Sequence, residues 1–386
     1  MENFEEKACL CALNRIFGFE PKYGQALIGH CGSAADVFKL KEDELEQLLG
    51  PFSKYRGRIC TRAVDEAAEE LLRLSETDIV FCGMGEDDYP PLLPECEDPP
   101  IGLYVRSSTP LKTLWNGNSI AVVGTRDISP YGREWCEKIV RALAETDSPP
   151  LIVSGLALGT DITAHRSALE AGMPTIGVMA TGPESVYPSR HHDFATKMCS
   201  TEGCALITDY PPGTAPLAIH FLRRNRIIAG LSRAVLLVES KIRGGGMMTC
   251  RLAFSYNRDV YCLPGRADDI RSQGCNELIR QKIAEPITSL TQLTQSLGML
   301  SRPRKSADLR ELVSASYTGR LSEEDIEMMA KILLTIRKNT GICIDEVAEV
   351  CSMDLRRTCE AVNMLEIDGF ISIDLLQRCS IKTKKV

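Results

Sequence analysis

The chain of 386 residues lacks the long apolar run of a membrane protein. No segment approaches the roughly 20 consecutive apolar residues with which a helix crosses a bilayer. The first residues, Met1–Glu6, are acidic, whereas an export signal starts with basic residues. We therefore expect a cytoplasmic protein that makes no contact with a membrane.

The 16 cysteines include no C-x-x-C pair, and no run of Cys and His has the spacing of a zinc site. In a chain without an export signal, such cysteines are reduced thiols that fill small apolar spaces. His191 and His192 stand beside Asp193, but no third ligand is spaced for a metal, so we interpret them as a solvated loop. The sequence predicts no bound metal.

Three signatures of nucleotide-binding and hydrolytic proteins are also missing. The chain contains no G-x-G-x-x-G turn, no Walker lysine loop and no G-x-S-x-G elbow. Ser154, Asp161 and His165 could form a hydrolytic trio, because Asp161 and His165 lie one helical turn apart. The same spacing suits a helix cap and a packed histidine, so we expect no catalytic residues and no cofactor.

The net charge of −7 is distributed unevenly along the chain. Residues 223–282 carry 12 Lys and Arg against 5 Asp and Glu. Residues 1–75 carry 10 against 13, and residues 321–386 carry 9 against 12. A basic middle between acidic ends favours one focused anion site over a uniformly basic surface.

The middle of the chain alternates short β-branched runs with segments of helix length. This pattern is typical of an α/β fold with a doubly wound parallel sheet. Ligands bind such sheets at the carboxyl ends of the strands, so the residues after each strand are the candidates. The expected strands are Ile120–Val123, Leu151–Ser154, Pro174–Met179, Ala205–Thr208, Ala234–Glu239 and Val260–Leu263.

The flanking regions have different patterns. Helical spacing predicts a helical domain over residues 1–75, whose turn at Phe17–Gly24 we interpret as structural. The α/β core then covers residues 76–295, beginning with an extended, proline-rich connector at Asp87–Pro94. Residues 296–320, which include the basic run Ser301–Ser306, are expected to form a linker.

Residues 321–386 show the plan of a winged-helix domain, three helices followed by a β-wing. The expected helices and strands are Glu323–Ile336, Cys343–Val350, Asp354–Ile367, Ile371–Ile373 and Cys379–Lys382. The third helix would carry charges of both signs, unlike a helix that reads the major groove. We therefore expect this domain to contact other proteins or to have a regulatory role.

Glycine follows four of the expected strands, in Gly124-Thr125-Arg126, in Gly155–Gly159, in Gly244-Gly245-Gly246 and at Gly265. Open backbone amides at the start of a helix bind phosphate groups. Arg126 would add a positive charge beside them, although a salt bridge to Asp161 is the structural alternative. Together the turns predict a phosphate-rich ligand at one edge of the sheet.

The stretch His220–Ser232 supplies the most specific chemistry. It carries one aromatic residue directly before a basic run, namely Phe221, Arg223, Arg224, Asn225 and Arg226. Bases stack on aromatic rings and guanidinium groups pair with phosphate oxygens, so this stretch predicts a grip on a nucleic-acid strand. The alternatives are that Phe221 packs in the core and that the arginines pair with carboxylates.

These motifs, in this order and spacing, resemble those of the DNA-processing protein A (DprA/Smf) family. The matching motifs are Val123–Arg126 with Ser129 and Tyr131-Gly132, Ser154–Ala157 with Gly159, Asp161 and Ala164-His165, Tyr187-Pro188, Phe221 with Arg224–Ser232, Val238-Glu239, Thr249, and Pro264-Gly265 with Gly274 and Asn276. The resemblance implies an extended Rossmann-like core between a SAM-like helical domain and a winged-helix domain. It also implies a homodimer that binds single-stranded DNA and loads the RecA recombinase, as in natural transformation.

The resemblance assigns roles to particular residues. Arg126 and the amides of Gly124 and Thr125 would take phosphate, Phe221 would stack on a base, and Gly244–Gly246 would let the backbone approach the strand. The full predicted DNA-binding set is Gly124, Thr125, Arg126, Ser154, Gly155, Phe221, Arg223, Arg224, Asn225, Arg226, Gly244, Gly245 and Gly246.

The chain departs from the family pattern at three places. Ala218 stands where many members have a lysine, Gly244–Met247 replaces a serine-containing loop, and His191 stands where an asparagine is common. Two other functions remain open, a phosphoribohydrolase-like enzyme and a nucleotide-sensing module on the same fold. The enzyme would need a carboxylate just after the glycine loop, where this chain has Cys250, Arg251 and Leu252.

Overall fold

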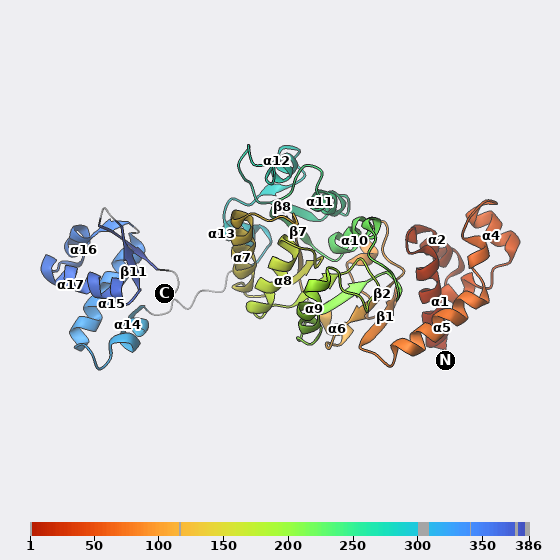
Figure 1. The fold of residues 1–386 in the computed structure, drawn as a ribbon, viewed down its shortest axis with the longest axis horizontal. Helices are drawn as coiled ribbons and strands as arrows, with labels where there is room; N and C mark the ends of the chain where they lie inside the picture. The colour runs from red at the N-terminus through yellow and green to blue at the C-terminus, as the bar shows by residue number, and fades with distance from the viewer. Residues whose placement is uncertain (1, 116, 300–308, 340, 375–376, 383–386) are drawn as a thin grey trace. The chain divides into compact units, whose positions relative to one another are not determined.

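The computed structural model describes residues 2–115, 117–299, 309–339, 341–374 and 377–382. The chain divides into two compact units, Met1–Ser301 and Arg302–Val386, each with a core of its own. Figure 1 shows their helices and strands. Among the described residues, none of the helices is long and apolar enough to cross a membrane.

A large, mostly parallel sheet forms the centre of the first unit. Within the described residues it has nine strands in the order β1-β2-β6-β5-β4-β3-β7-β8-β9. The strands from β6 to β9 pair in parallel, while β2 is antiparallel to both β1 and β6. The strands are β1 (Ile79–Gly83), β2 (Gly102–Arg106), β3 (Ser119–Val123), β4 (Leu151–Ser154), β5 (Thr175–Val178), β6 (Ala205–Thr208), β7 (Ala234–Leu237), β8 (Asp259–Cys262) and β9 (Glu285–Pro286).

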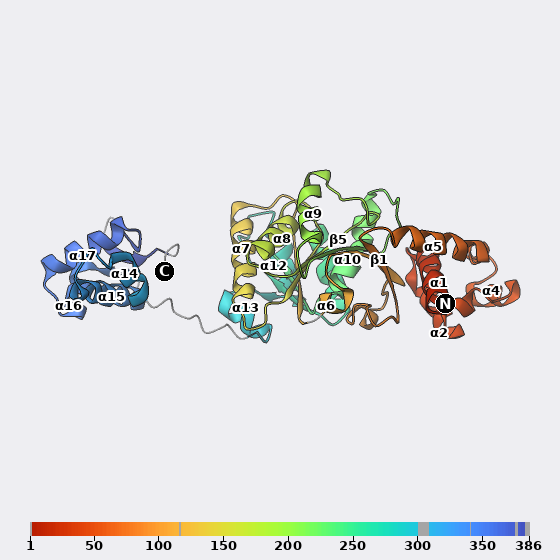
Figure 2. The same cartoon turned by 90° about the horizontal axis from the view of Figure 1, so that it is seen from below.

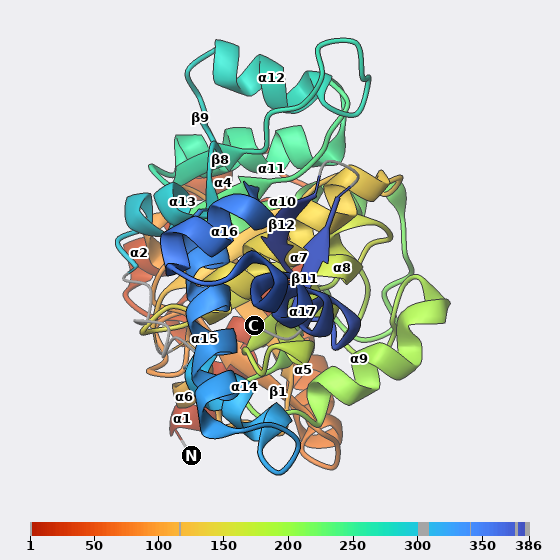
Figure 3. The same cartoon turned by 90° about the vertical axis from the view of Figure 1, so that its left-hand side faces the viewer.

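Helices cover both faces of this sheet, because successive side chains of each buried strand point to opposite faces. On β3, Ala121 and Val123 pack with residues of α10 and α11, whereas Ile120 and Val122 pack with residues of α7 and α8. The helices of the core are α6 (Leu111–Leu114), α7 (Pro130–Ala144), α8 (Thr160–Glu170), α9 (His192–Cys199), α10 (Ala218–Gly230), α11 (Gly245–Ser255), α12 (Gln273–Arg280) and α13 (Leu290–Ser296), with short turns η2 (Leu93–Glu95) and η3 (Ser189–His191). Figure 2 shows α7 beside α8 and α13, and Figure 3 shows α11 and α12 at β8.

The first part of the chain is helical, as the sequence predicts. Its elements are α1 (Glu2–Phe17), α2 (Pro21–Cys31), α3 (Ala34–Val37), α4 (Glu42–Leu49), η1 (Arg56–Arg58) and α5 (Thr61–Leu74). Their apolar core also takes in Phe81 of β1 and Tyr104 of β2. These helices therefore pack directly on the edge of the sheet.

The second unit contains α14 (Leu309–Tyr317), α15 (Glu323–Lys338), β10 (Ile342–Cys343), α16 (Ile344–Cys351), α17 (Leu355–Ile367), β11 (Ile371–Ile373) and β12 (Arg378–Ile381). The strands form a separate sheet in the order β10-β12-β11. Val313 and Tyr317 of α14 are buried together with Ile332 of α15 and Val362 of α17. This small core holds the unit together.

The expected parallel strands are confirmed as β3 to β8, with ends that differ by at most two residues. The structure adds two strands that the sequence analysis did not expect, β1 and β2, which flank the proline-rich connector Asp87–Pro94. Within the linker expected at 296–320, residues 309–317 form α14. Val313 and Tyr317 lie one helical turn apart and are both buried, and this spacing of apolar residues is typical of a helix. The basic run Ser301–Ser306 lies outside the described residues.

Candidate functional site

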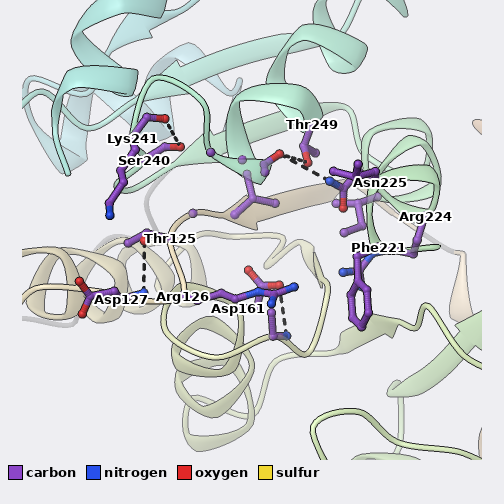
Figure 4. Close-up of a pocket in the computed structure, with 18 of the residues that line it drawn as sticks. Thr125, Arg126, Asp127, Asp161, Phe221, Arg224, Asn225, Ser240, Lys241 and Thr249 are labelled. Carbon is purple, nitrogen blue, oxygen red and sulfur yellow. Dashed lines mark hydrogen bonds between the residues drawn. The ribbon is translucent and has the colours of Figure 1, made fainter. Parts of the chain in front are cut away.

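A cavity of about 790 Å³ opens at the carboxyl ends of β3 and β7. The chain runs from β3 to β4 on one side, whereas β7 and β8 extend the sheet from the other side of β3. Such a reversal leaves a crevice between the loops that follow the two central strands. Residues that line it include Gly124, Thr125, Arg126, Asp127, Asp161, Tyr187, Ala218, Phe221, Leu222, Arg224, Asn225, Ser240, Lys241, Arg243, Gly244, Gly245, Gly246 and Thr249, many of them drawn in Figure 4.

The loop after β3 brings Arg126 to the mouth of the cavity. The carbonyl of Thr125 accepts bonds from the amide of Thr160 at 3.1 Å and from its hydroxyl at 3.2 Å, which fixes the loop against α8. Gly124 has no room for a side chain, because a Cβ there would come within 3.0 Å of the carbonyl of Glu239. The exposed guanidinium of Arg126 forms no ion pair with Asp161 or with any other described residue. Its charge is therefore open to a ligand.

Phe221 stands in the cavity wall rather than in the core. Its ring is half-buried and meets the exposed ring of Tyr187 edge to face at 5.3 Å between centroids. The guanidinium carbon of Arg126 lies 5.2 Å from the centroid of the same ring. A flat ring with a cation beside it suits the base and phosphate of one nucleotide.

Arg224 reaches the cavity from α10 as a buried cation. Its Nη1 donates to the carbonyl of Gly155 at 2.7 Å and to that of Val178, so it ties α10 to the ends of β4 and β5. Burial lowers the pKa of Arg224 to about 10, with the nearby charge of Arg126 acting in the same direction. The group remains charged at neutral pH and makes the electrostatic potential of the cavity more positive.

Asp161 is the buried anion of the site. Burial raises the pKa of its carboxyl, which accepts a bond from the amide of Ala157 at 3.3 Å. Asp127 also lines the cavity, but its charge is paired with Arg271 at 2.9 Å. Against these two carboxylates stand the cations of the lining, Arg126, Arg224, Lys241 and Arg243. The balance favours an anionic ligand.

The loop after β7 presents backbone amides. Gly245 and Gly246 begin α11, where the first N–H groups have no carbonyl within the helix to bind. The side-chain Nδ2 of Asn225 reaches the carbonyl of Gly245 at 3.5 Å and joins this loop to α10. Gly246 packs against Gly124, since a Cβ on Gly246 would lie 3.4 Å from the Cα of Gly124. The two glycine loops therefore meet at the back of the cavity.

Four predicted DNA-binding residues lie outside the lining of the cavity, namely Ser154, Gly155, Arg223 and Arg226. Ser154 donates to the carbonyl of Val122 at 2.6 Å, and Gly155 leaves space for the guanidinium of Arg224. Arg226 pairs with Asp209 at 2.6 Å, both side chains being buried. Arg223 instead points to the helical N-terminal region, where it lies over the ring of Phe19.

In the possible hydrolytic trio, His165 and Ser154 each bind a group outside the trio. His165 is buried, and its Nδ1 lies 2.7 Å from the hydroxyl of Thr175, while Ser154 serves Val122. Burial lowers the pKa of His165 to about 3, so its imidazole is neutral. The expectation that His191 belongs to a solvated loop was wrong. His191 is buried and its Nδ1 lies 2.8 Å from the carbonyl of Leu156.

The structure adds residues that the sequence argument did not assign to the site. Tyr187, Ser240 and Lys241 line the cavity. Tyr187 belongs to the Tyr-Pro motif, which supported the family resemblance but did not predict which residues its ring contacts. Lys241 lies in the loop between β7 and α11, so the rule that ligands bind after the strands could have found it.

Comparison with known proteins identifies the relatives of this chain. A model of the DNA recombination-mediator protein A family matches residues 80–298. The chain is 38% identical over 307 residues to the protein Smf of Escherichia coli, which covers 77% of this chain and 78% of that protein.

Solved structures similar to this chain include two proteins of the same kind from other bacteria. DNA processing protein A from Streptococcus pneumoniae has a TM-score of 0.61 and 29% identity, over 74% of this chain and 95% of that one. DNA processing protein A from Helicobacter pylori has a TM-score of 0.50 and 28% identity, over 56% of this chain and 95% of that one. The Helicobacter structure was described for its single-stranded DNA binding mode.

Proposed function

The chain belongs to the DNA recombination-mediator protein A family, and on that premise we propose that its cavity binds single-stranded DNA. The observation that carries the proposal is the meeting of Phe221, Tyr187 and Arg126 above two glycine loops. An aromatic wall takes a base, while the arginine and the open amides take phosphates. The binding mode described for the Helicobacter relative supports the same ligand.

The site residues of this proposal are those that line the cavity. Arg126, Gly124 and Thr125 contact phosphate from the β3 loop, and Gly244, Gly245 and Gly246 do so from the β7 loop. Phe221 stacks on a base, and Asn225 orients the β7 loop. Arg224 adds positive charge from below, whereas Arg226, Ser154 and Gly155 support the site from outside it.

We further propose that the protein is not an enzyme. Ser154 and His165 are both committed to structural hydrogen bonds, which supports a binding role. The glycine loop is followed by Met247, Met248 and Thr249, with no carboxylate of the kind that a phosphoribohydrolase needs. Incubation with purine monophosphates should therefore release no free base.

The cellular role follows from the family. We propose an extended Rossmann-like core that acts in the cytoplasm as a homodimer and delivers the bound strand to the RecA recombinase. For the second unit we propose a winged-helix domain that contacts proteins. The charges of α17 support this, because its two arginines pair with carboxylates, Arg356 with Glu360 at 3.5 Å and Arg357 with Asp325 at 3.5 Å.

The direct test compares a fluorescent oligo-dT with a blunt duplex of the same length in one salt series. The bases of a duplex are stacked on each other and cannot reach the ring of Phe221 without being unpaired, so the single strand should bind more tightly. Equal or tighter binding of the duplex would overturn the proposal. RecA delivery is tested separately, by the rate at which RecA filaments form on the strand with and without the protein.

A further inference from the structure

The exposed ring of Phe19 lies on the far side of α10 from the cavity. Phe19 belongs to the turn between α1 and α2 and is 49% exposed. The guanidinium carbon of Arg223, on α10, lies 4.3 Å from the centroid of this ring. Arg223 and Phe221 are two residues apart on the helix, so their side chains point to nearly opposite sides of it.

The turn that carries Phe19 is held firmly against the core. Asn14 of α1 donates to the carbonyl of Asp209 at 2.9 Å and accepts from the amide of Gly102 at 3.3 Å. The ring of Phe19 lies 5.6 Å from that of His220, which in turn stacks on Tyr210 at 4.4 Å. Phe19 is therefore fixed in place while about half of its surface stays open.

Arg223 keeps its charge available beside this ring. No ion pair to Arg223 is formed within the described part of the chain. The carboxylate of Glu20, next to Phe19, is bound by Lys54 at 2.9 Å and by the hydroxyl of Tyr55. The guanidinium lies over one face of the ring. Aromatic rings and guanidinium planes can both stack a base, and the guanidinium can also pair with the adjoining phosphate.

The surface between the cavity and this pair is open. Ala218 lines the cavity, and the neighbouring Leu217 and Ile219 are 54% and 46% exposed. These residues form the first turn of α10 and the residue before it, and α10 has no acidic residue in its first turn. A strand that leaves the cavity thus has to cross only the end of one helix, about 10–12 Å wide.

We propose that Phe19 and Arg223 form a second stacking site for single-stranded DNA, reached by a strand that leaves the cavity over the start of α10. The helical N-terminal region then takes part in DNA binding through one turn. This inference rests on the proposed function of the cavity, and it explains why Arg223 stands outside the cavity in an otherwise basic stretch.

The test uses oligo-dT of two lengths with the full chain. A ~6-nucleotide strand occupies the cavity alone and a ~20-nucleotide strand extends past it, given that compact single-strand sites cover about 4–16 nucleotides. Phe19→Ala should weaken binding of the longer strand by about 5- to 150-fold, the loss expected for one stacked base, and leave the shorter strand within about twofold of wild type. Phe52→Ala, at a ring that is 98% exposed in the same region, is the matched control and should change neither affinity.

Two conservative variants separate stacking from simple packing. Phe19→Leu keeps an apolar contact with His220 but offers no flat ring, so it should bind the longer strand as weakly as Phe19→Ala. Phe19→Trp should retain the wild-type affinity. If Phe19→Leu binds both strands like wild type, or if Phe19→Ala weakens both lengths equally, the second site is overturned. If the wild-type chain binds neither strand, the proposed function of the cavity fails first.

Discussion

Replacement of Phe221 by alanine tests whether the cavity binds DNA by stacking a base on this ring or by charge alone. A base stacked on an aromatic ring contributes ~1–3 kcal/mol, so Phe221→Ala should weaken oligo-dT binding by about 5- to 150-fold. The salt dependence of binding should not change, because no charge is removed.

The cost of the same change to stability follows from the contacts of the ring. Phe221→Ala removes an edge-to-face pair with Tyr187, which contributes ~0.5–1.5 kcal/mol, and a cation contact with Arg126, which contributes ~0.5–1 kcal/mol at an exposed site. These two contacts sum to about 1–2.5 kcal/mol. Because the ring is only half-buried, its truncation also loses less apolar burial than that of a core phenylalanine, which costs ~3–5 kcal/mol in total. The variant should fold and melt only a few degrees lower.

The assay measures fluorescence anisotropy and melting temperature on the same preparations. Phe254→Ala is the matched control, because this phenylalanine is 52% exposed on α11 and lies outside the cavity lining. A large fall in melting temperature with an unchanged affinity would refute the reasoning, since it would mean that the ring of Phe221 supports the fold and meets no base.

Three further predictions concern charged groups. Arg126→Ala should lower the slope of log affinity against log salt by about 0.7, the value for one single-strand phosphate contact, and an unchanged slope would contradict this role. Arg226→Ala should cost ~3–5 kcal/mol of unfolding free energy in urea, because Asp209 is left buried without its partner, yet the folded fraction should bind DNA normally. His165 has a pKa of about 3 in the folded chain and ~6.5 in the unfolded chain, so below pH ~6.5 the unfolded chain binds more protons. The free energy of unfolding should therefore fall by up to ~1.4 kcal/mol for each unit by which the pH is lowered below ~6.5. His165→Gln should flatten this fall, and an equally steep fall in the variant would contradict the role of His165.

The sequence predicted the parts of the fold that depend on local pattern. The strands β3 to β8 are short, mostly apolar and almost entirely buried, and each of them can be predicted from its own sequence. Strands β1 and β2 could not be predicted in this way, because β1 pairs with β2 across the proline-rich stretch and β2 pairs with β6, which lies much later in the chain. Nothing in the 76–118 stretch itself shows that Tyr104 pairs with Thr208.

The sequence predicted which residues belong to the candidate site, but not where their side chains point. Phe221, Arg224 and Arg226 are neighbours in one helix, yet their side chains have different partners. Phe221 forms part of the cavity wall, Arg224 donates to buried carbonyls, and Arg226 forms a buried ion pair. Helical residues turn by 100° each, so a basic run cannot face one ligand as a whole. Which arginine meets the ligand depends on where the carboxylates and carbonyls of other strands lie, and that is decided by the tertiary fold.

The most direct measurement of the central claim is a photocrosslink from a single strand that carries iodouracil in place of thymine. A base stacked in the cavity lies against Phe221 and Tyr187, so the crosslinked peptides should contain one of these two residues. The crosslink should also be lost in Phe221→Ala if Phe221 is the acceptor. Crosslinks found only in the second unit, on α17 or β12, would contradict the claim that this cavity holds the strand.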